Sequence, residues 1–383
     1  MKWRRVKLGE ILESSKECRF VEHPLDEKLI SVQLHGKGAV QRVLSQEKAP
    51  SPFKGFVGRE GQIVYSRIWA RKGAIAKIGK DLDGVVVSSE FPLFNVCPVA
   101  DIDYLIYAFQ SSSFKQQLEL AGAGTSGQNR IKEKAFLNFE IPLPPLGEQK
   151  RIAEILGGVS KAINEIHTEI KRVESLCGTL VSLYAEDQST KKLEDLATLS
   201  GGLSLGSHRK NKPHSVGYLR VANVFWGKIL YDEIKELNCT DQEFERTLLQ
   251  DGDVLITEAH ANRFQVGRSA VFRGEEQALV FQNHLFRARP NKNIDSDVLA
   301  AMLSSVAVRR QLYQMTKTTS GLNTISISQV RSLRVPVLDT TKQAELLSFL
   351  QESNKLNYLL HRKLSLLQEL QKSLATRAFA GLL

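Results

Sequence analysis

Two polar segments of the sequence are rich in side chains that can hydrogen bond to the edges of nucleic-acid bases. Each directly follows a short apolar run, GQIVYSRI at 61–68 and GDVLITEA at 252–259. Arginine pairs with guanine and Asn or Gln pairs with adenine, whereas apolar groups contact the thymine methyl. The two segments occupy equivalent places in the sequence but carry different side chains, which favours one scaffold that presents two recognition codes. The alternative interpretation is that each segment is only the solvated tip of a hairpin. The candidates are Ser66, Arg67, Trp69, Arg71 and Lys72, followed in the second half by Glu258, His260, Asn262, Arg263 and Gln265.

A second polar segment occurs further along each half, GAGTSGQNR at 122–130 and TKTTSGLNT at 316–324. Small hydroxyl residues, glycine, an amide and a base suit hydrogen bonds to phosphate oxygens. The same segments could instead serve only to cap and turn the chain. The candidates here are Thr125, Ser126, Gln128, Asn129 and Arg130, with Thr318, Thr319, Ser320, Asn323 and Thr324 in the second half.

The sequence does not indicate catalysis or a bound cofactor. It contains neither a Walker A lysine motif nor the Asn-Pro-Pro-aromatic motif of a base-flipping adenine methyltransferase. The glycines at 122–127 fit GxGxxG only formally, because they follow a helical pattern rather than a strand. Asp251, Asp253 and Glu258 could be metal ligands of a nuclease, but no lysine completes that constellation. The eight histidines show no HxxH spacing and the four cysteines no CxxC, so we expect no metal site.

Length and charge favour a chain of two or three domains with separate contacts to polyanions. The net charge is +10 over 383 residues. It divides into +5 for residues 1–147, −2 for 148–187, +4 for 188–340 and +3 for 341–383. Basic excess on both halves and not between them fits two polyanion contacts, although ordinary solubility charge explains it as well. No apolar run approaches about 18 residues and the N-terminus lacks an apolar signal core, so we expect a cytoplasmic protein.

The chain is built from two similar halves. Residues 126–156 align without a gap on residues 320–350, and the matched runs at 61–68 and 252–259 lie upstream in the same order. The repeat therefore spans about half the chain and is far longer than a solenoid repeat. The identities are Ser126/Ser320, Gly127/Gly321, Asn129/Asn323, Ile131/Ile325, Pro142/Pro336, Gln149/Gln343 and Leu156/Leu350.

A long helix with coiled-coil spacing is predicted at the end of each half. Alternating steps of four and three from Ile152 to Tyr184 give ten seam positions without a charge, and the same register shifted by 194 runs from Leu346 to Ala378. Two such apolar stripes favour antiparallel packing of the helices on each other. Residues 148–184 would span about 54 Å, or about 16 base pairs of duplex, so the pair could act as a ruler. Additional leucines, Leu356, Leu359, Leu366 and Leu370, suggest a further neighbour.

We therefore predict an α+β fold with two similar mixed α/β domains, separated by a pair of long antiparallel coiled-coil helices. Short strand-like runs punctuated by glycine, such as AIAKI and SAVFRG, predict the sheets, and residues 103–120 and 296–315 each predict a helical stretch. The expected boundaries are 1–147 for the first recognition domain, 148–187 for the first spacer helix, 188–341 for the second recognition domain and 342–383 for the second spacer helix.

The layout resembles the DNA-specificity subunit of type I restriction-modification enzymes. The resemblance is carried by IPLPPLGEQKRIAEIL at 141–156, which continues into a long helix, and by the two halves. The second copy departs from it, with Asp339, Thr340 and Thr341 in place of Pro-Leu-Gly. The resemblance implies a non-catalytic subunit that reads a bipartite, asymmetric site on double-stranded DNA. It also implies two methyltransferase subunits, restriction and motor subunits, and S-adenosylmethionine, ATP and Mg bound by those partners rather than by this chain.

Two other functions remain open at this point. The chain could itself be a DNA adenine methyltransferase or a nuclease, which incubation with DNA, S-adenosylmethionine and magnesium would reveal. It could also be an assembly scaffold whose basic domains bind acidic proteins. Salt-sensitive, sequence-dependent DNA binding would exclude that second alternative.

Overall fold

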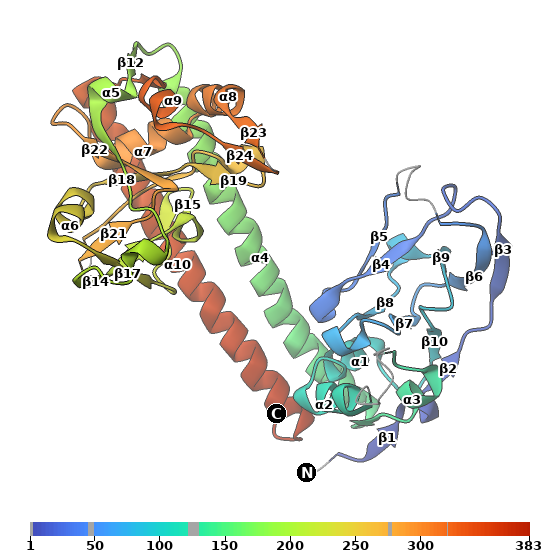
Figure 1. The fold of residues 1–383 in the computed structure, drawn as a ribbon. Helices are drawn as coiled ribbons and strands as arrows, with labels where there is room; N and C mark the ends of the chain where they lie inside the picture. Colours follow the sequence, from blue (N-terminus) through green and yellow to red (C-terminus); the bar gives the residue numbers. More distant parts are fainter. Residues whose placement is uncertain (1–2, 45–49, 122–129, 275–277, 320) are drawn as a thin grey trace. The chain divides into compact units, whose positions relative to one another are not determined.

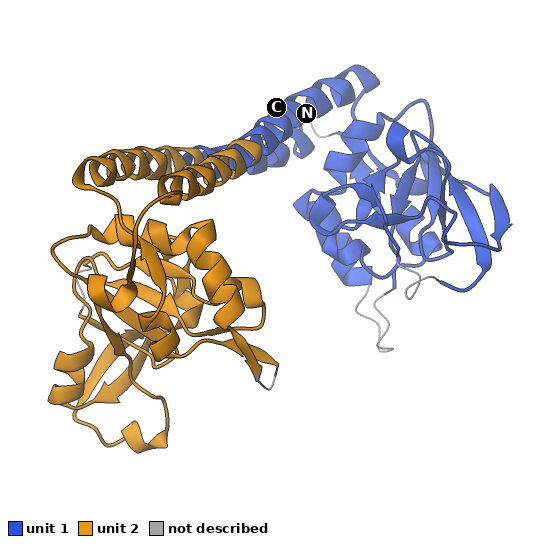
Figure 2. Cartoon of the chain, turned by 90° about the horizontal axis from the view of Figure 1, so that it is seen from above, with its two compact units in different colours: residues 1–167, 362–383 blue, residues 168–361 orange. Residues whose placement is uncertain are grey.

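A computed structural model describes residues 3–44, 50–121, 130–274, 278–319 and 321–383, and it consists of two compact units (Figure 1). Unit 1 comprises residues 1–167 and 362–383, and unit 2 comprises residues 168–361 (Figure 2). Both units combine mainly antiparallel sheets with short helices; in unit 2, one strand pair is parallel. The α+β fold with two similar domains and a pair of long helices is therefore confirmed.

Unit 1 contains a central antiparallel sheet with the strand order β2-β10-β7-β8 and three smaller strand groups. The central strands are β2 (Leu12–Ser14), β10 (Leu93–Val96), β7 (Ile63–Tyr65) and β8 (Ile75–Lys77). The others are β3 (Cys18–Val21), β6 (Phe53–Gly58) and β9 (Val85–Val87); β4 (Ile30–Val32) and β5 (Ala39–Gln41); and β1 (Arg5–Lys7) with β11 (Glu140–Pro142). All three side chains of β7 are buried, as expected for the central region of a sheet.

Unit 2 repeats this plan with a central sheet of order β13-β22-β18-β20. These strands are β13 (Ala197–Gly201), β22 (Leu285–Pro290), β18 (Val254–Thr257) and β20 (Ser269–Val271). A second sheet contains β17 (Lys235–Cys239), β14 (His214–Leu219) and β21 (Leu279–Phe281), and a third contains β19 (Ala259–His260), β24 (Leu322–Thr324) and β23 (Lys317–Thr319). The remaining pairs are β15 (Val224–Phe225) with β16 (Lys228–Ile229), and β12 (Thr190–Lys192) with β25 (Arg334–Pro336).

Among the described residues, the three short helices of unit 1 recur in the same order in unit 2, which has two more. Unit 1 has α1 (Ile102–Ala108), α2 (Ser112–Ala121) and α3 (Glu133–Leu137), and unit 2 has α5 (Leu193–Leu196), α6 (Asp241–Thr247), α7 (Ser296–Ser304), α8 (Val306–Met315) and α9 (Ile327–Arg331). Each helical stretch predicted as one element is thus two helices. The 3-10 helices are η1 (Leu8–Glu10), η2 (Leu34–Gly36), η4 (Ala70–Lys72), η5 (Lys80–Leu82), η6 (Ser207–Arg209), η7 (Val221–Asn223) and η8 (Arg263–Gln265).

The two long helices, α4 (Leu146–Ala185) and α10 (Thr340–Phe379), each contribute to both units. Within unit 1 the Gln371 amide donates to the Ser160 hydroxyl at 2.7 Å, and within unit 2 the Tyr184 hydroxyl donates to the Glu345 carboxylate at 3.2 Å. From the first pair to the second, the residue number increases on α4 and decreases on α10. The two helices therefore pack antiparallel. All ten predicted seam positions on each helix are buried or half-buried.

Each core is completed by the end of the long helix that begins in the other repeat. In unit 1, Ala378 is fully buried and Phe379 packs against the core that surrounds Tyr104. In unit 2, Val181 and Ala185 belong to the core. The extra leucines of α10 are exposed, from 43% for Leu356 to 58% for Leu366. None of the helices among the described residues is long and apolar enough to cross a membrane.

Candidate nucleic-acid interface

The same backbone arrangement joins the two predicted polar segments in each unit. In unit 1 the Arg67 N–H donates to the Glu90 carbonyl at 2.9 Å, and the Arg67 carbonyl accepts from the Ile131 N–H at 2.8 Å. In unit 2 the Glu258 N–H donates to the His284 carbonyl at 3.0 Å, and the Glu258 carbonyl accepts from the Ile325 N–H at 3.0 Å. We call this pair of hydrogen bonds the shared frame. It lies just after β7 in unit 1 and just after β18 in unit 2.

Side chains on the shared frame differ in charge between the units. Arg67 in unit 1 corresponds to Glu258 in unit 2, and Glu90 corresponds to His284. The Arg67 guanidinium lies 3.6 Å from the Glu133 carboxylate, whereas the Glu258 carboxylate lies 2.6 Å from the His284 imidazole. The two units therefore present opposite charges at one backbone position.

Arg130, the last residue of its predicted segment, also reaches the frame of unit 1. Its guanidinium lies 3.3 Å from the Glu90 carboxylate, so two ion pairs, Arg67–Glu133 and Arg130–Glu90, involve residues joined by the shared frame or next to it. The side chains involved are all partly exposed. Such pairs contribute little to stability in water.

In unit 1, the polar segment after β7 forms a tight turn that carries Trp69, Arg71 and Lys72. Ser66 is buried, and its hydroxyl accepts a hydrogen bond from the Trp69 N–H at 3.3 Å, so Ser66 shapes the turn rather than facing solvent. Trp69 is 46% exposed, and the Lys72 amine lies 4.9 Å from the centre of its ring. The Arg71 guanidinium donates to the Glu119 carbonyl at 3.2 Å.

Two neighbouring features fix the conformation of this turn. Gly73 has φ +76°, and a Cβ there would lie 3.2 Å from the Cα of His35, so only glycine fits easily. On the other side, the Tyr65 hydroxyl donates to the Ile131 carbonyl at 3.0 Å and its ring stacks on Phe136 at 4.2 Å. Burial raises the pKa of the Tyr65 hydroxyl above its usual range, so it remains a donor.

In unit 2 the two predicted segments form one small sheet. Strand β19 pairs with β24, and β24 pairs with β23. Asn323 is buried in this sheet, where its amide donates to the Ala261 carbonyl at 2.8 Å and accepts from the Thr318 hydroxyl at 2.9 Å. Thr324 is half-buried opposite Ala259. Asn323 therefore holds the sheet together through its side chain.

The turn after β19 is also ordered by its own polar groups. The Asn262 N–H donates to His260 Nδ1 at 2.9 Å, and the Asn262 side-chain oxygen accepts from the Phe264 N–H at 2.9 Å. Gln265 is half-buried, and its N–H donates to the Asn262 carbonyl at 2.9 Å. Arg263 donates to the Thr316 carbonyl at 3.0 Å. Several predicted contact residues are thus also the residues that build the turn.

An aromatic and arginine cluster beside this turn was not predicted from the sequence. Phe264 is 62% exposed and stacks on Tyr313 at 5.0 Å, and the Arg263 guanidinium lies 4.2 Å from the Tyr313 ring. Arg309 lies 4.1 Å from the ring of Trp226, and burial lowers the pKa of Arg309. These residues come from segments far apart in sequence, so spacing alone could not reveal the cluster. Exposed rings and arginines can stack on bases.

Some predicted residues cannot be placed. Thr125, Ser126, Gln128, Asn129 and Ser320 lie outside the described residues, as does the side chain of Thr319.

The acidic residues considered as nuclease ligands have other partners. Asp253 is buried and accepts two hydrogen bonds from Arg289, at 2.7 and 2.8 Å. Asp251 accepts from the Gly274 N–H at 2.8 Å, and Glu258 faces His284. Among the described residues, no group of three or more His, Cys, Asp or Glu side chains could hold a metal ion. These three carboxylates therefore do not converge on one point.

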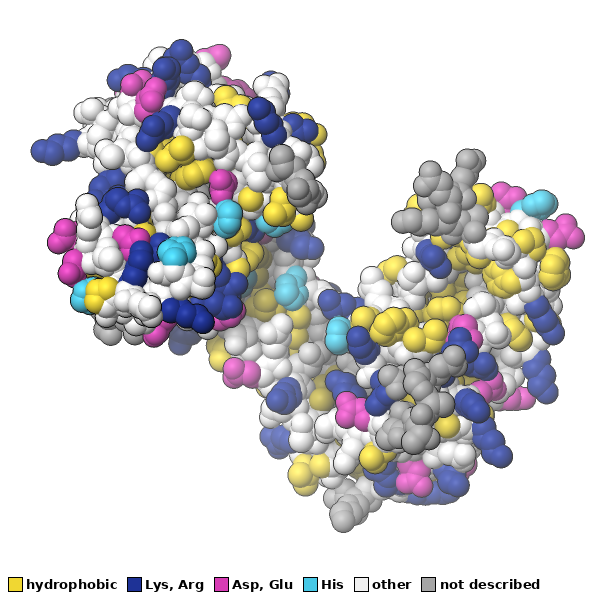
Figure 3. Space-filling view, viewed as in Figure 1, with side chains coloured by type: hydrophobic (Ala, Val, Ile, Leu, Met, Phe, Trp, Pro, Cys, Tyr) yellow, Lys and Arg dark blue, Asp and Glu magenta, His cyan; other side chains and the backbone are white. Residues whose placement is uncertain are grey.

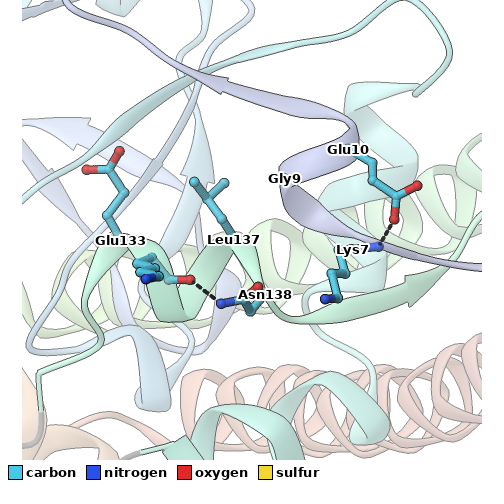
Figure 4. Close-up of a pocket in the computed structure, with 7 residues that line it drawn as sticks. Lys7, Gly9, Glu10, Glu133, Leu137 and Asn138 are labelled. Carbon is cyan, nitrogen blue, oxygen red and sulfur yellow. Dashed lines mark hydrogen bonds between the residues drawn. The ribbon is translucent and has the colours of Figure 1, made fainter.

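A surface pocket of unit 1 is lined in part by Glu133, whose carboxylate pairs with Arg67 of the shared frame (Figure 4). It has a volume of about 520 Å³ and lies between η1 and α3, with Glu133 among its lining residues. Inside it the Lys7 N–H donates to Glu10 at 2.9 Å, and the Asn138 amide donates to the Lys134 carbonyl at 2.9 Å (Figure 4). On the face drawn in Figure 3, basic and acidic side chains are intermingled on each unit.

Comparison with known proteins supports the resemblance inferred from the repeat. The family model described as "Type I restriction modification DNA specificity domain" matches residues 1–175. The chain is 27% identical over 303 residues to the type I restriction enzyme EcoKI specificity subunit of Escherichia coli K12, covering 73% of this chain and 65% of that protein. It is 20% identical over 301 residues to the StySPI specificity subunit of Salmonella potsdam, covering 73% and 65% respectively.

Solved structures share the fold along the whole chain. A structure described as the "structural basis underlying complex assembly and conformational transition of the type I R-M system" matches with a TM-score of 0.63 at 19% identity, over 100% of this chain and 98% of that chain. A type I restriction-modification S subunit from M. genitalium matches with a TM-score of 0.53 at 15% identity, over 99% and 96%.

Residues 1–175 match the family model of the type I restriction-modification DNA specificity domain, and the resemblance predicted from the repeated layout is confirmed. The alignments with the curated relatives span 65% of the length of each of these two relatives.

Proposed function

We propose that this protein is the non-catalytic specificity subunit of a type I restriction-modification complex. In this proposal, two domains each read one half of an asymmetric, bipartite site on double-stranded DNA. The observation that carries it is the shared frame, which holds Arg67 in one unit and Glu258 in the other at the same backbone position. Identical scaffolds with different exposed side chains are what two different half-site codes require.

The boundaries proposed are the sequence-based ones, with recognition domains at 1–147 and 188–341 and spacer helices at 148–187 and 342–383. Within them, Arg67, Trp69, Arg71, Lys72 and Arg130 are the proposed contact residues of unit 1. Ser66 supports their turn. In unit 2 the proposed contacts are Glu258, His260, Asn262, Arg263, Gln265, Thr318 and Thr324, to which Phe264 and Tyr313 add stacking surface, while Asn323 holds the sheet. The residues outside the described ranges, Thr125, Ser126, Gln128, Asn129 and Ser320, stay as candidates, with Thr319.

The partners proposed are two methyltransferase subunits and restriction subunits with motor activity. The exposed leucines Leu356, Leu359, Leu366 and Leu370 on α10 support a helical protein partner, since scattered exposure is ordinary but a stripe on one helix is a typical docking surface. We expect S-adenosylmethionine, ATP and Mg to be bound by those partners, because this chain lacks their sequence motifs. The expected location is the cytoplasm.

A domain exchange tests the proposal. The chain is purified with its methyltransferase subunits, and bound duplexes are selected from random DNA and sequenced. Replacing residues 1–147 with the first domain of another specificity subunit should change one half of the selected site and leave the other half intact. Retention of both halves would refute the proposal.

A second measurement separates this function from the alternatives. Binding should weaken steeply with salt and should depend on sequence, since phosphate contacts release counterions while base contacts discriminate. The purified chain alone, incubated with DNA, S-adenosylmethionine and magnesium, should produce neither methylated nor cleaved DNA. Product formation by the chain alone would favour an independent enzyme instead.

A further inference from the structure

Two glutamines make the same set of hydrogen bonds at the start of the two long helices. In unit 1 the Gln149 side-chain oxygen accepts from the Asp101 N–H at 2.7 Å. Its amide nitrogen donates to the carbonyls of Val99 at 3.0 Å and Pro144 at 2.8 Å. Both amide hydrogens are therefore used, and Gln149 is fully buried.

Gln343 repeats this set in unit 2. Its side-chain oxygen accepts from the Asp295 N–H at 3.4 Å, and its amide nitrogen donates to the carbonyls of Asn293 at 3.3 Å and Leu338 at 3.0 Å. Each of these four residues lies 194 positions after its counterpart, so the arrangement is duplicated group for group. The distances are longer and Gln343 is only half-buried, so the second copy is the weaker one.

Each glutamine connects the long helix to the body of its own domain. Asp101 and Asp295 are the N-caps of α1 and α7, which pack in the domain cores. One side chain thus joins three chain segments, which are the entry to the long helix, the loop before α1 or α7, and the start of that short helix. A contact of this kind restrains the direction in which the long helix leaves its domain.

We propose that Gln149, and to a smaller extent Gln343, are positioning residues that fix the direction of each spacer helix relative to its recognition domain. The inference rests on the proposed function, because direction matters only when the helix sets the spacing of two half-sites. A helix of 40 residues is about 60 Å long, so a tilt of about 5° at its start moves its far end by about 5 Å, against about 3.4 Å for one base-pair step.

Substituting Gln149→Met tests this role. Methionine has a similar length and volume, but it removes the partner of the Asp101 N–H and of the Val99 and Pro144 carbonyls, of which the bond to Pro144 is buried. The matched controls are Gln343→Met, which removes the weaker copy, and Gln33→Met, which changes an exposed glutamine in unit 1.

The first measurement does not depend on DNA. Nitroxide labels are attached through cysteines introduced at the exposed Lys115 in α2 and Lys161 in α4, both in unit 1, after the three accessible native cysteines are replaced by serine. Distances between the labels are then measured by pulsed electron paramagnetic resonance. We expect a broader or shifted distribution for Gln149→Met and an unchanged one for Gln33→Met. An unchanged distribution in a folded Gln149→Met protein would overturn the positioning role.

The second measurement uses the complex with methyltransferase subunits and a DNA pool in which the two selected half-sites are separated by spacers of varied length. The wild type should select one spacer, and Gln149→Met should lose that preference while keeping the bases of both half-sites. A merely stabilising residue would lower the unfolding temperature without changing spacer selection, and that result would refute the proposal. If Gln149→Met does not fold, Gln343→Met carries both measurements, with the labels moved to the exposed Arg310 in α8 and Lys355 in α10, both in unit 2, and with a smaller broadening expected.

Failure of the two proposals can be told apart. If the wild type selects no bipartite site, the proposed function is wrong, whatever the label distances show. If the wild type selects a site with one spacer and Gln149→Met selects the same spacer as sharply, the function stands and the positioning role is wrong.

Discussion

The C-terminal end of the chain should stabilise unit 1 rather than unit 2, although it follows unit 2 in sequence. Phe379, at the end of α10, packs on Tyr104 with ring centroids 5.7 Å apart, and Ala378 beside it is fully buried. The Trp3 indole donates to the Ala378 carbonyl at 3.1 Å, and Arg151 donates to the Leu383 carbonyl at 3.0 Å. Replacing Phe379→Ala should therefore loosen the core of unit 1.

The size of this effect follows from the burial of the ring. Truncating a fully buried phenylalanine to alanine costs about 3 to 5 kcal/mol, and Phe379 is half-buried, so we expect about 2 kcal/mol. In a unit of this size, about 2 kcal/mol lowers the unfolding temperature by about 4 to 8 °C. Leu366→Ala is the matched control, because Leu366 lies on the same helix and is 58% exposed.

The three tryptophans allow each unit to be followed separately. Trp3 and Trp69 lie in unit 1 and Trp226 lies in unit 2. In a Trp226→Phe background, tryptophan fluorescence follows the unfolding of unit 1. In a background in which Trp3 and Trp69 are replaced by phenylalanine, it follows the unfolding of unit 2. Phe379→Ala should lower the midpoint of the unit 1 transition and leave the unit 2 transition close to its starting value. An equal or larger shift of the unit 2 transition would refute the assignment of the helix end to unit 1.

Three further outcomes follow from the described contacts. Asp253→Asn removes the buried partner of Arg289 and should destabilise unit 2 by about 3 kcal/mol, so an unchanged unit 2 midpoint would contradict the pairing. Lys212 holds the pKa of Glu243 at about 2, below its ordinary 4.5. The stability this carboxylate contributes is thus present above pH 4.5 and lost as the pH falls toward 2. Acid unfolding of unit 2 should therefore be less steep in Glu243→Gln. Arg67→Ala should relax base selection in one half-site, at a cost of about 1 to 3 kcal/mol in binding, and equal relaxation in both halves would count against it.

The architecture was largely predictable because it depends on periodic patterns. The seam from Ile152 to Tyr184 requires only spacing to be recognised, and the ten positions on each long helix are indeed buried or half-buried. The helix breaks at Ser111 and Ser305 were not predicted, because the apolar helical pattern of the sequence continues through both positions. There the serine hydroxyl donates to the carbonyl three residues earlier, Ala108 or Met302, and a new helix begins after it. Such local competition for backbone groups is a weak signal in a single sequence.

The candidate interface was only partly predictable, since its members combine two kinds of role. Sequence composition marked Ser66 and Asn323 as contact residues because their groups can hydrogen bond, but both are buried and hold neighbouring backbone instead. The stacked pair of Phe264 and Tyr313 was missed because its members are brought together only by tertiary structure. Polar character alone does not distinguish a side chain that supports a turn from one that faces a ligand.

Comparison of the two repeats makes that distinction. Positions that keep their residue type hold geometry: Ile131 and Ile325 are buried and donate to the shared frame, and Gln149 and Gln343 tie the long helices to their domains. One position that reverses its charge, Arg67 against Glu258, lies on the frame with its side chain partly exposed. If duplication preserved the scaffold while each half acquired its own code, substituting the exposed frame residues should alter which bases are selected. Substituting the glutamines should instead alter only the spacing between the two half-sites.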